Sequence, residues 1–136
     1  MGGHTIMIKR FDIEQCDYQE IAFIPKNYDT ENACFSIKKK PEIWFKATID
    51  EVVGCCSLLI LSQKRVRFRN NYEIQQYRKV GIGKALIVQS ELWAKKNNFK
   101  VVYVRGIYRT YLHENYEIKA KYLKRKPYQY WYEKNI

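Results

Sequence analysis

A short turn that contains two glycines constrains the fold of this chain more than any other feature. The turn lies between a strand-like segment, residues 65–76, and a helix-like segment, residues 82–97. In the first segment apolar residues alternate with arginines, and in the second they recur at helical spacing. The apolar run that follows, residues 99–104, is typical of a buried parallel strand. A strand, a helix and a second strand predict a crossover connection within a mixed α/β fold.

Further strands are predicted on either side of this unit, most of them antiparallel. Residues 43–49 and 52–61 are strand-like, and the polar pair Asp50-Glu51 between them has the length of a tight hairpin. We also expect a strand at residues 5–11, short helices at residues 12–23 and 108–114, and two last strands at residues 116–123 and 128–133.

The predicted helix at residues 82–97 is amphipathic. Its apolar stripe is assigned to Ile82, Ala85, Leu86, Leu92 and Trp93. Its polar residues, Lys84, Glu91, Lys95 and Lys96, are assigned to the remaining surface. The helix is therefore expected to pack on the sheet through the apolar stripe.

Length and composition place the chain among globular proteins. With 136 residues, 46% of them hydrophobic, the chain can bury one core, so residues 1–136 are predicted to form a single domain. No apolar run reaches the roughly 20 residues of a membrane-spanning helix, so no membrane association is expected. The cysteines, Cys16, Cys34, Cys55 and Cys56, form no C-x-x-C pair. We therefore expect free thiols, no metal site and, since no secretory signal is recognisable, a cytoplasmic location.

The formal net charge of +11 bears on the class of partner. Such an excess favours an anionic partner, which could be nucleic acid, a ribosome, an acidic protein surface or an anionic cofactor. Lys, Asn, Ile and Tyr are also the residues that an A/T-rich gene encodes most often, and then the lysines need no partner. Charge alone leaves these alternatives open.

Two residue series could contribute to an anionic interface. The first is Arg65, Arg67 and Arg69, which would share one face of a strand. They could steer an acidic acceptor, although an exposed sheet face is the favoured interpretation. The second is Tyr128, Tyr130 and Tyr132. They could form a stacking platform for bases, although strand propensity and core packing explain them more simply.

The glycine turn has the chemistry of a phosphate cradle. A helix N-terminus presents unpaired backbone N–H groups and the positive end of the helix dipole, and glycines let a phosphate approach them. Arg78 and Lys84 add positive charge. A dinucleotide fingerprint would need a further small residue and an acidic residue after the next strand. A nucleotide P-loop would need a hydroxyl where Ala85 stands. Both alternatives are therefore set aside.

These residues resemble the cofactor loop of the GNAT superfamily of N-acetyltransferases, which has the form [QR]-x-x-G-x-[GA]. Arg78, Gly81 and Gly83 match this form. Residues 52–55 resemble the opening of the family's third strand, residues 99–104 its fifth strand, and residues 111–116 its Y-x-x-x-G-F segment. The likeness covers roughly residues 42–136. The family usually has glycine at Lys79 and at Asn115, and proline near Gln75.

The resemblance implies a mostly antiparallel central sheet that is flanked by helices and splayed between its fourth and fifth strands. Acetyl-CoA would enter the splay as cosubstrate and would acetylate a primary amine of an acceptor that the sequence does not identify. The backbone of Glu73, Ile74 and Gln75 would pair with the pantetheine arm. The pyrophosphate would be held by Arg78, Lys79, Val80, Gly81, Ile82, Gly83 and Lys84.

The resemblance also implies catalytic groups, because acyl transfer to an amine needs a proton acceptor and a proton donor. Tyr111 corresponds to a tyrosine that protonates the departing CoA sulfur, and it keeps the family's spacing to Tyr116, unlike Tyr108. Glu73 is the nearest carboxylate that could act as base, since residues 64–72 contain none. A water relay or a backbone carbonyl is the alternative. His113 is expected to be a surface residue.

Three functions from different classes remain open at the level of sequence. The leading one is an acetyl-CoA-dependent N-acetyltransferase. The second is a basic nucleic-acid-binding module, and an acetyltransferase acting on RNA or aminoacyl-tRNA would combine the two. The third is a catalytically silent CoA-binding scaffold, which the missing strand carboxylate favours.

Overall fold

Seven strands form one mixed sheet in the order β1-β2-β3-β4-β5-β7-β6. The computed structural model describes residues 10–30, 35–36, 41–106, 109–122 and 128–136. The strands are β1 (Asp12–Cys16), β2 (Glu42–Ile49), β3 (Glu51–Ile60), β4 (Arg65–Glu73), β5 (Val101–Gly106), β6 (Glu117–Tyr122) and β7 (Gln129–Asn135). Only β4 and β5 pair in parallel, and every other neighbouring pair is antiparallel. The predicted fold class and the crossover are confirmed.

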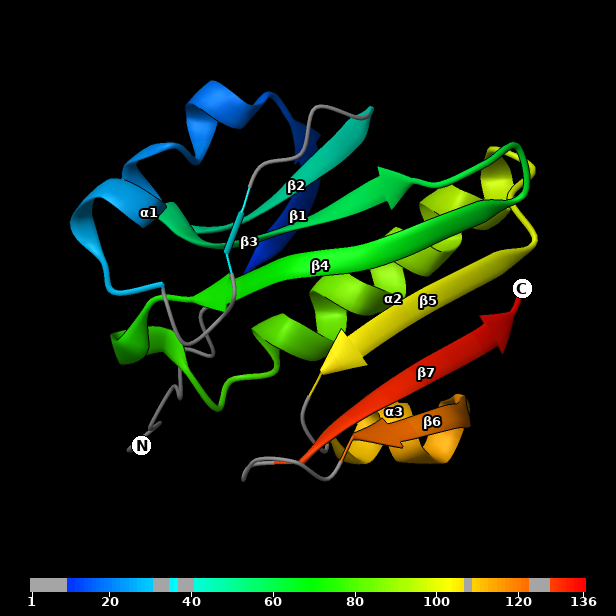
Figure 1. Ribbon diagram of the computed structural model, residues 1–136. Helices are drawn as coiled ribbons and strands as arrows, with labels where there is room; N and C mark the ends of the chain where they lie inside the picture. The colour runs from blue at the N-terminus through cyan, green and yellow to red at the C-terminus, as the bar shows by residue number, and fades with distance from the viewer. Residues whose placement is uncertain (1–9, 31–34, 37–40, 107–108, 123–127) are drawn as a thin grey trace, which may run out of the picture.

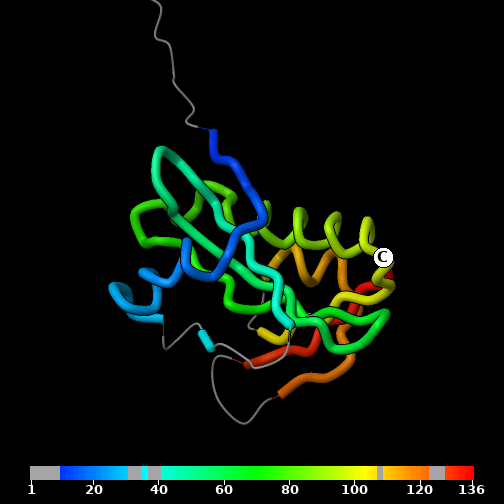
Figure 2. Tube along the Cα trace, turned by 90° about the horizontal axis from the view of Figure 1, so that it is seen from above, coloured from blue at the N-terminus to red at the C-terminus, as the bar shows by residue number. Residues whose placement is uncertain are grey.

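Three α-helices accompany the sheet: α1 (Phe23–Asn27), α2 (Ile82–Lys96) and α3 (Thr110–Asn115). Among the described residues, the 3-10 turn η1 (Tyr18–Glu20) precedes α1, and the 3-10 turn η3 (Gln75–Tyr77) precedes α2. Helices α2 and α3 lie on the same side of the sheet (Figures 1 and 2). They enclose the main core with apolar side chains such as Val66, Phe68, Val102 and Val104. A smaller core lies under α1, on the opposite face, and includes Ile24, Trp44 and Tyr72.

The hairpin between β2 and β3 occupies the predicted place. Asp50 turns the chain with φ 59°, a left-handed conformation that Asp tolerates better than most residues. The adjacent cysteines of β3 point to opposite cores, Cys55 to the smaller and Cys56 to the main one. Cys16, Cys55 and Cys56 are free thiols, and burial raises the pKa of Cys56 to about 12. A thiol held protonated in this way is unreactive.

The prediction for the N-terminal segment is wrong. Residues 12–23 were expected to be helical, but Asp12–Cys16 is a strand, and only η1 and the short α1 follow it. The reason is tertiary, since β1 pairs with the edge of β2 from Asp12 opposite Thr48 to Cys16 opposite Trp44. Residues 5–9 of the expected first strand lie outside the described residues.

One prediction for the face of α2 is also wrong. Leu92 is 55% exposed instead of lying in the buried stripe, whereas Glu91, assigned to the surface, is 7% exposed. The buried stripe is Ile82, Leu86, Ile87, Ser90, Glu91 and Ala94. Helix α3 and β7 together cover the side of α2 that carries Glu91, through hydroxyl and ammonium contacts.

Candidate active site

The sheet opens between β4 and β5. Their parallel pairing runs only from Arg65 opposite Val101 to Phe68 opposite Val104. Beyond Phe68, β4 continues to Glu73 against β3 alone, while β5 continues against β7 (Figure 1). No described strand pairs with the β5-facing edge of residues 69–73. Backbone N–H and C=O groups there can bind an extended ligand, as they would bind a neighbouring strand.

A bulge at Asn70 decides which side chains face this opening. Asn70 has φ 56°, and the register against β3 shifts between Cys55 and Ser57. Before the bulge Phe68 points to the main core, and after it Tyr72 points to the smaller core. Glu73 consequently lies on the same side of the sheet as α2. Sequence alternation cannot reveal this exchange of faces, because a bulge inserts one residue into the period of two.

The glycine turn forms the N-terminus of α2, beside the opening. Gly81 caps the helix with φ 90°, a left-handed conformation that favours glycine. The first hydrogen bond of the helix runs from the N–H of Ala85 to the carbonyl of Gly81, at 3.0 Å. The N–H groups of residues 82–84 therefore have no partner within the helix and point out of its N-terminus. This arrangement binds anions.

Lys79 shares the left-handed conformation, with φ 70°. This backbone geometry explains why the family usually has glycine at this position. Lysine adopts the same left-handed conformation at a cost in stability. Val80 is 54% exposed, and Arg78, Lys79 and Lys84 are all exposed. The Arg78 Nε donates to the carbonyl of Glu73 at 3.1 Å, which ties the turn to the end of β4.

Glu73 lies against the first turn of α2. A Cβ at Gly83 would come within 2.4 Å of the Glu73 Oε1, so glycine at this position leaves the room that the carboxylate occupies. Burial raises the pKa of the Glu73 carboxyl, and the charges of Arg109 and Arg78 oppose this rise. The structure thus places Glu73 next to the predicted phosphate site, together with two arginines.

Tyr111 is held by Glu91, a buried carboxylate that was expected at the surface. Its hydroxyl donates to both oxygens of Glu91, at 2.6 and 3.0 Å. The hydroxyl of Tyr116 donates to the same carboxylate at 2.9 Å, and the Lys134 Nζ lies 3.1 Å from it. Burial and the Glu91 charge raise the pKa of Tyr111 above its usual range. Both tyrosines therefore stay protonated at neutral pH. Helical spacing predicts only on which face of α2 Glu91 lies. It cannot reveal Tyr111, Tyr116 and Lys134 as its partners, because they come from other parts of the chain.

A second buried carboxylate lies on the opposite side of the sheet. Glu42 pairs with Arg69 at 3.2 Å, and both side chains are at least 92% buried. Ser57 and Asn70 also donate to Glu42, at 2.6 and 3.2 Å. Arg69 also donates to Ser36. Arg69 is thus part of a buried network beside the opening, which corrects the prediction that it shares an exposed face.

The other candidate residues are placed as follows. Tyr132 is fully buried, and Tyr130 packs against the main core, so the alternative of a platform made of Tyr128, Tyr130 and Tyr132 is wrong. His113, expected at the surface, lies against these rings, with its Nδ1 2.7 Å from the Tyr132 hydroxyl. Tyr108 lies outside the described residues.

This set of groups fits an acyl-CoA molecule. The unpaired edge of β4 suits an amide-bearing arm, and the α2 N-terminus with its exposed Arg78, Lys79 and Lys84 suits a pyrophosphate. Within the described residues no helix has the length and hydropathy needed to cross a membrane. No group of three potential metal ligands occurs in that part of the chain.

Solved structures of acetyltransferases share this fold. The IAA acetyltransferase from Bacillus cereus ATCC 14579 superposes with a TM-score of 0.73 at 16% identity, with 93% of this chain and 100% of that chain covered. A GNAT family acetyltransferase from Elizabethkingia anophelis with acetyl-CoA bound gives 0.65 at 13% identity (93% and 98% covered). The PaiA N-acetyltransferase from Thermoplasma acidophilum in complex with coenzyme A gives 0.66 at 12% identity (93% and 99%).

At such identities the likeness concerns the fold alone, and no curated protein matches the chain. The sequence itself matches the model of the acetyltransferase (GNAT) family over residues 8–116. This match begins well before residue 42, where the resemblance was expected to start, and it includes the strand at Asp12–Cys16. The chain therefore belongs to the GNAT family of acetyltransferases.

Proposed function

We propose that this protein transfers the acetyl group of acetyl-CoA to a primary amine of an acceptor. The observation that carries the proposal is the opening between β4 and β5 beside the N-terminus of α2. Family membership supports it, as do fold relatives that are described with acetyl-CoA or coenzyme A bound. That the acceptor group is a primary amine and that the protein is cytoplasmic both stay predictions from the sequence.

The proposed cofactor contacts come from two segments. The backbone of Glu73, Ile74 and Gln75, where β4 ends and η3 begins, would pair with the pantetheine arm. The turn from Arg78 to Lys84 would hold the pyrophosphate through backbone N–H groups and positive charge. In the proposal, Val80 contributes its backbone, since its side chain is exposed.

The proposed chemistry assigns one proton movement to each catalytic group. Acetyl-CoA supplies an activated thioester, whose thiolate needs a proton as it leaves. Tyr111 is proposed as the donor, and it must turn its hydroxyl from Glu91 to the sulfur to do so. Glu73 is proposed as the base for the amine, because its raised pKa brings it nearer to neutral pH. A water relay remains the alternative base.

Cofactor binding is tested by calorimetric titration of acetyl-CoA against the wild type, Gly81→Glu and Gly81→Ala. Both substitutions strain the left-handed backbone at Gly81, but only glutamate places a negative charge where the pyrophosphate is proposed to lie. We expect Gly81→Glu to weaken binding at least about 10-fold more than Gly81→Ala, from repulsion of about 1.4 kcal/mol. A wild type that does not bind acetyl-CoA would contradict the proposal.

The scaffold alternative is separated from the enzyme by turnover. A silent scaffold would bind acetyl-CoA with the same dependence on Gly81 but would release no coenzyme A from it with any amine acceptor. Release of free thiol in the presence of a panel of amines decides between the two. No comparison with known proteins favours a nucleic-acid function, so that alternative depends on the surface described next.

A further inference from the structure

Three arginines lie over three aromatic rings on one face of the sheet. The guanidinium carbons of Arg65, Arg67 and Arg105 lie 5.8, 5.4 and 4.8 Å from the ring centroids of Tyr103, Trp131 and Tyr122 respectively. These six residues, here called the stacked face, come from the adjacent strands β4, β5, β7 and β6. Alternation along each strand turns them all away from the main core.

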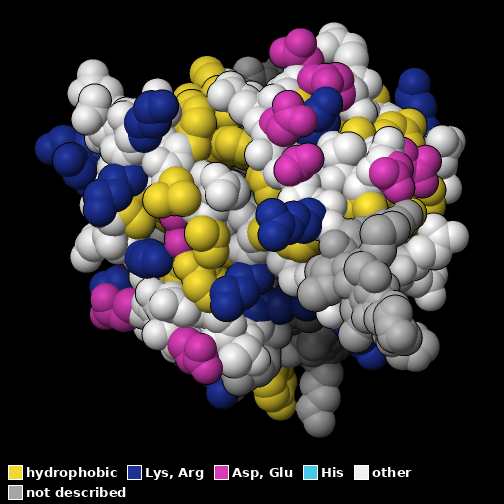
Figure 3. Space-filling view, turned by 180° about the vertical axis from the view of Figure 1, so that it is seen from behind, with side chains coloured by type: hydrophobic (Ala, Val, Ile, Leu, Met, Phe, Trp, Pro, Cys, Tyr) yellow, Lys and Arg dark blue, Asp and Glu magenta, His cyan; other side chains and the backbone are white. Residues whose placement is uncertain are grey.

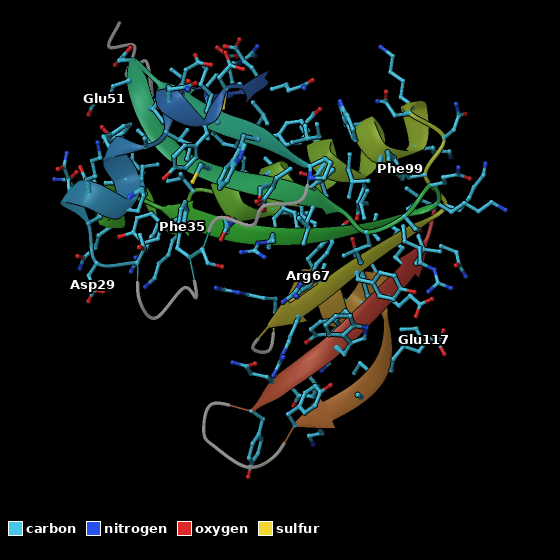
Figure 4. All side chains as sticks on the ribbon, turned by 45° about the horizontal axis from the view of Figure 1, so that its top comes forward. Asp29, Phe35, Glu51, Arg67, Phe99 and Glu117 are labelled. Atoms are coloured by element: carbon cyan, nitrogen blue, oxygen red, sulfur yellow. The ribbon has the colours of Figure 1, made fainter. Side chains whose placement is uncertain are left out.

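No described helix packs on the stacked face. Helices α2 and α3 lie on the other side of the sheet, and the smaller core under α1 involves β2, β3 and the end of β4. In Figure 4, Arg67 lies over the sheet between the α1 end and the edge strand β6, which Glu117 marks. The face seen from behind mixes Lys and Arg with apolar and acidic side chains (Figure 3).

The stacked face is hollowed and partly exposed. A shallow hollow of about 530 Å³ is lined by Leu61, Ser62, Arg65, Tyr103 and Trp131. The ring of Tyr122 is 46% exposed. An amide lies beside it, because the Oε1 of Gln129 accepts from the Arg105 Nε at 3.2 Å. Tyr103 is only 9% exposed, so the planar groups presented here are the rings of Trp131 and Tyr122 and the guanidinium groups, together with a hydrogen-bonding amide.

The stacked face reaches the opening of the sheet. The last residue pair between β4 and β5 is Phe68 with Val104. Arg67 and Tyr103 form the pair just before it, and Arg105 is the first residue of β5 beyond it. On β5, β6 and β7 this face carries two described carboxylates: Glu133, which is opposite Tyr103, and Glu117, which is opposite Glu133. Both lie farther from the opening than Arg105, and Glu42, on the same side of the sheet, is paired with Arg69. Glu117 is paired with Lys119 at 3.1 Å. Positive charge therefore dominates toward the opening.

We propose that the stacked face binds single-stranded nucleic acid. Exposed bases stack on aromatic rings and on guanidinium planes, while the arginine charges pair with phosphates. The net charge of +11 attracts such a polyanion at long range. The carboxylates of an acidic peptide would pair with the arginines but would not stack on the rings as bases do, and a duplex hides the faces of its bases. A single strand is the partner that uses both kinds of group.

The binding is independent of acetyl transfer, so the two proposals fail separately. A strand lying along β5 and β7 would end where the opening of the sheet lies, which places one end of the ligand beside the proposed acceptor site. Acetyl-CoA would approach from the other side of the sheet, where α2 begins. Nucleic-acid binding is therefore expected with or without acetyl-CoA.

The test is fluorescence anisotropy with a labelled oligonucleotide of about 12 nucleotides, single-stranded or as a duplex, at about 50 and 200 mM salt. Three variants alter the stacked face: Arg65→Gln/Arg67→Gln, Trp131→Ala and Tyr122→Ala. The matched control is Lys95→Gln/Lys96→Gln, which removes two exposed charges at the end of α2. Melting temperatures establish that each variant folds. If Trp131→Ala does not fold, Tyr122→Ala tests the loss of one ring in its place.

We expect the arginine variant to weaken single-strand binding at least about 10-fold and to reduce the slope of log K against log salt by about 1.4. Loss of one ring should weaken binding about 5- to 150-fold without changing that slope. The lysine control should change affinity less than 3-fold, roughly the effect of net charge alone. The proposal is overturned if the arginine and lysine double variants lose the same amount of single-strand affinity. It is also overturned if the wild type binds a duplex or polyglutamate as tightly as the single strand, or binds no single strand at the lower salt.

Discussion

Tyr111 and Tyr116 donate to the same buried carboxylate, Glu91, but only Tyr111 is proposed to act in catalysis. Residue identity explains little of this difference, since the two phenols have the same ordinary pKa of 10.0, and burial raises both. What differs is position. Tyr111 belongs to α3, just after β5, and its ring is half-buried, whereas Tyr116 is 6% exposed.

The two tyrosines provide a matched pair of variants. Tyr111→Phe and Tyr116→Phe each remove one hydroxyl that donates to the Glu91 carboxylate, which costs about 1.5–3 kcal/mol of stability. We expect Tyr111→Phe alone to lower turnover, by about 10²- to 10⁴-fold, with acetyl-CoA affinity nearly unchanged. Steady-state kinetics and calorimetry measure both quantities. Equal turnover by two folded variants would reduce Tyr111 to a packing residue.

Glu73 predicts a pH dependence of stability. Burial raises the pKa of its carboxyl above the ordinary 4.5, so the folded protein disfavours the ionised form. The wild type carries this cost above the raised pKa and is relieved of it below the unfolded pKa. Glu73→Gln should therefore raise Tm at pH 7, and the gain should shrink as the pH falls to 4.5 and below.

The control for this measurement is Glu114→Gln, because Glu114 is an exposed glutamate of α3. Its difference in Tm from the wild type should not follow the same trend. Differential scanning fluorimetry over this range of pH makes the comparison. A gain for Glu73→Gln that is equally large at acid pH would assign the effect to packing against Gly83 instead of to the charge.

At the scale of elements, the turn between β4 and α2 combines two positions of left-handed backbone, Lys79 and Gly81. Glycine suits the second, whereas a side chain at the first costs about 1–2 kcal/mol. The exposed ammonium of Lys79 beside the proposed pyrophosphate site is the corresponding gain. This element thus trades local stability for charge at the site.

The trade predicts opposite effects of one substitution. Lys79→Gly should raise the free energy of unfolding by up to about 1 kcal/mol. Relief of the backbone strain stabilises the folded state, and the greater conformational entropy of glycine in the unfolded chain offsets part of this gain. It should also weaken acetyl-CoA binding by a few fold, because a positive charge is lost. Urea unfolding and calorimetry measure the two effects. Val80→Gly is the control, and a stability change of the same sign there would argue against strain at Lys79.

At the scale of the whole molecule, the two proposed sites lie on opposite faces of the sheet. The glycine turn and Glu73 lie on the side of α2, whereas the stacked face lies on the opposite side. The opening between β4 and β5 connects the two sides. A ligand bound on one side can therefore meet a group presented on the other without either crossing the core.

The sequence by itself determined the elements whose signals are local. Alternation, helical spacing and turn residues were enough to predict the β2–β3 hairpin, the crossover through α2 and the glycine turn at Gly81, because these signals act over a few residues. They were also enough for the family, through Arg78, Gly81 and Gly83.

Only the tertiary structure decided the rest. Asp12–Cys16 became a strand because β2 offered an edge, and Glu91 became buried because Tyr111, Tyr116 and Lys134 surround it. The bulge at Asn70 set the face of Glu73, and the order of the strands placed arginines of β4 and β5 over rings of β5, β7 and β6. Each of these outcomes depends on contacts between segments far apart in the chain, whose energies no local pattern contains.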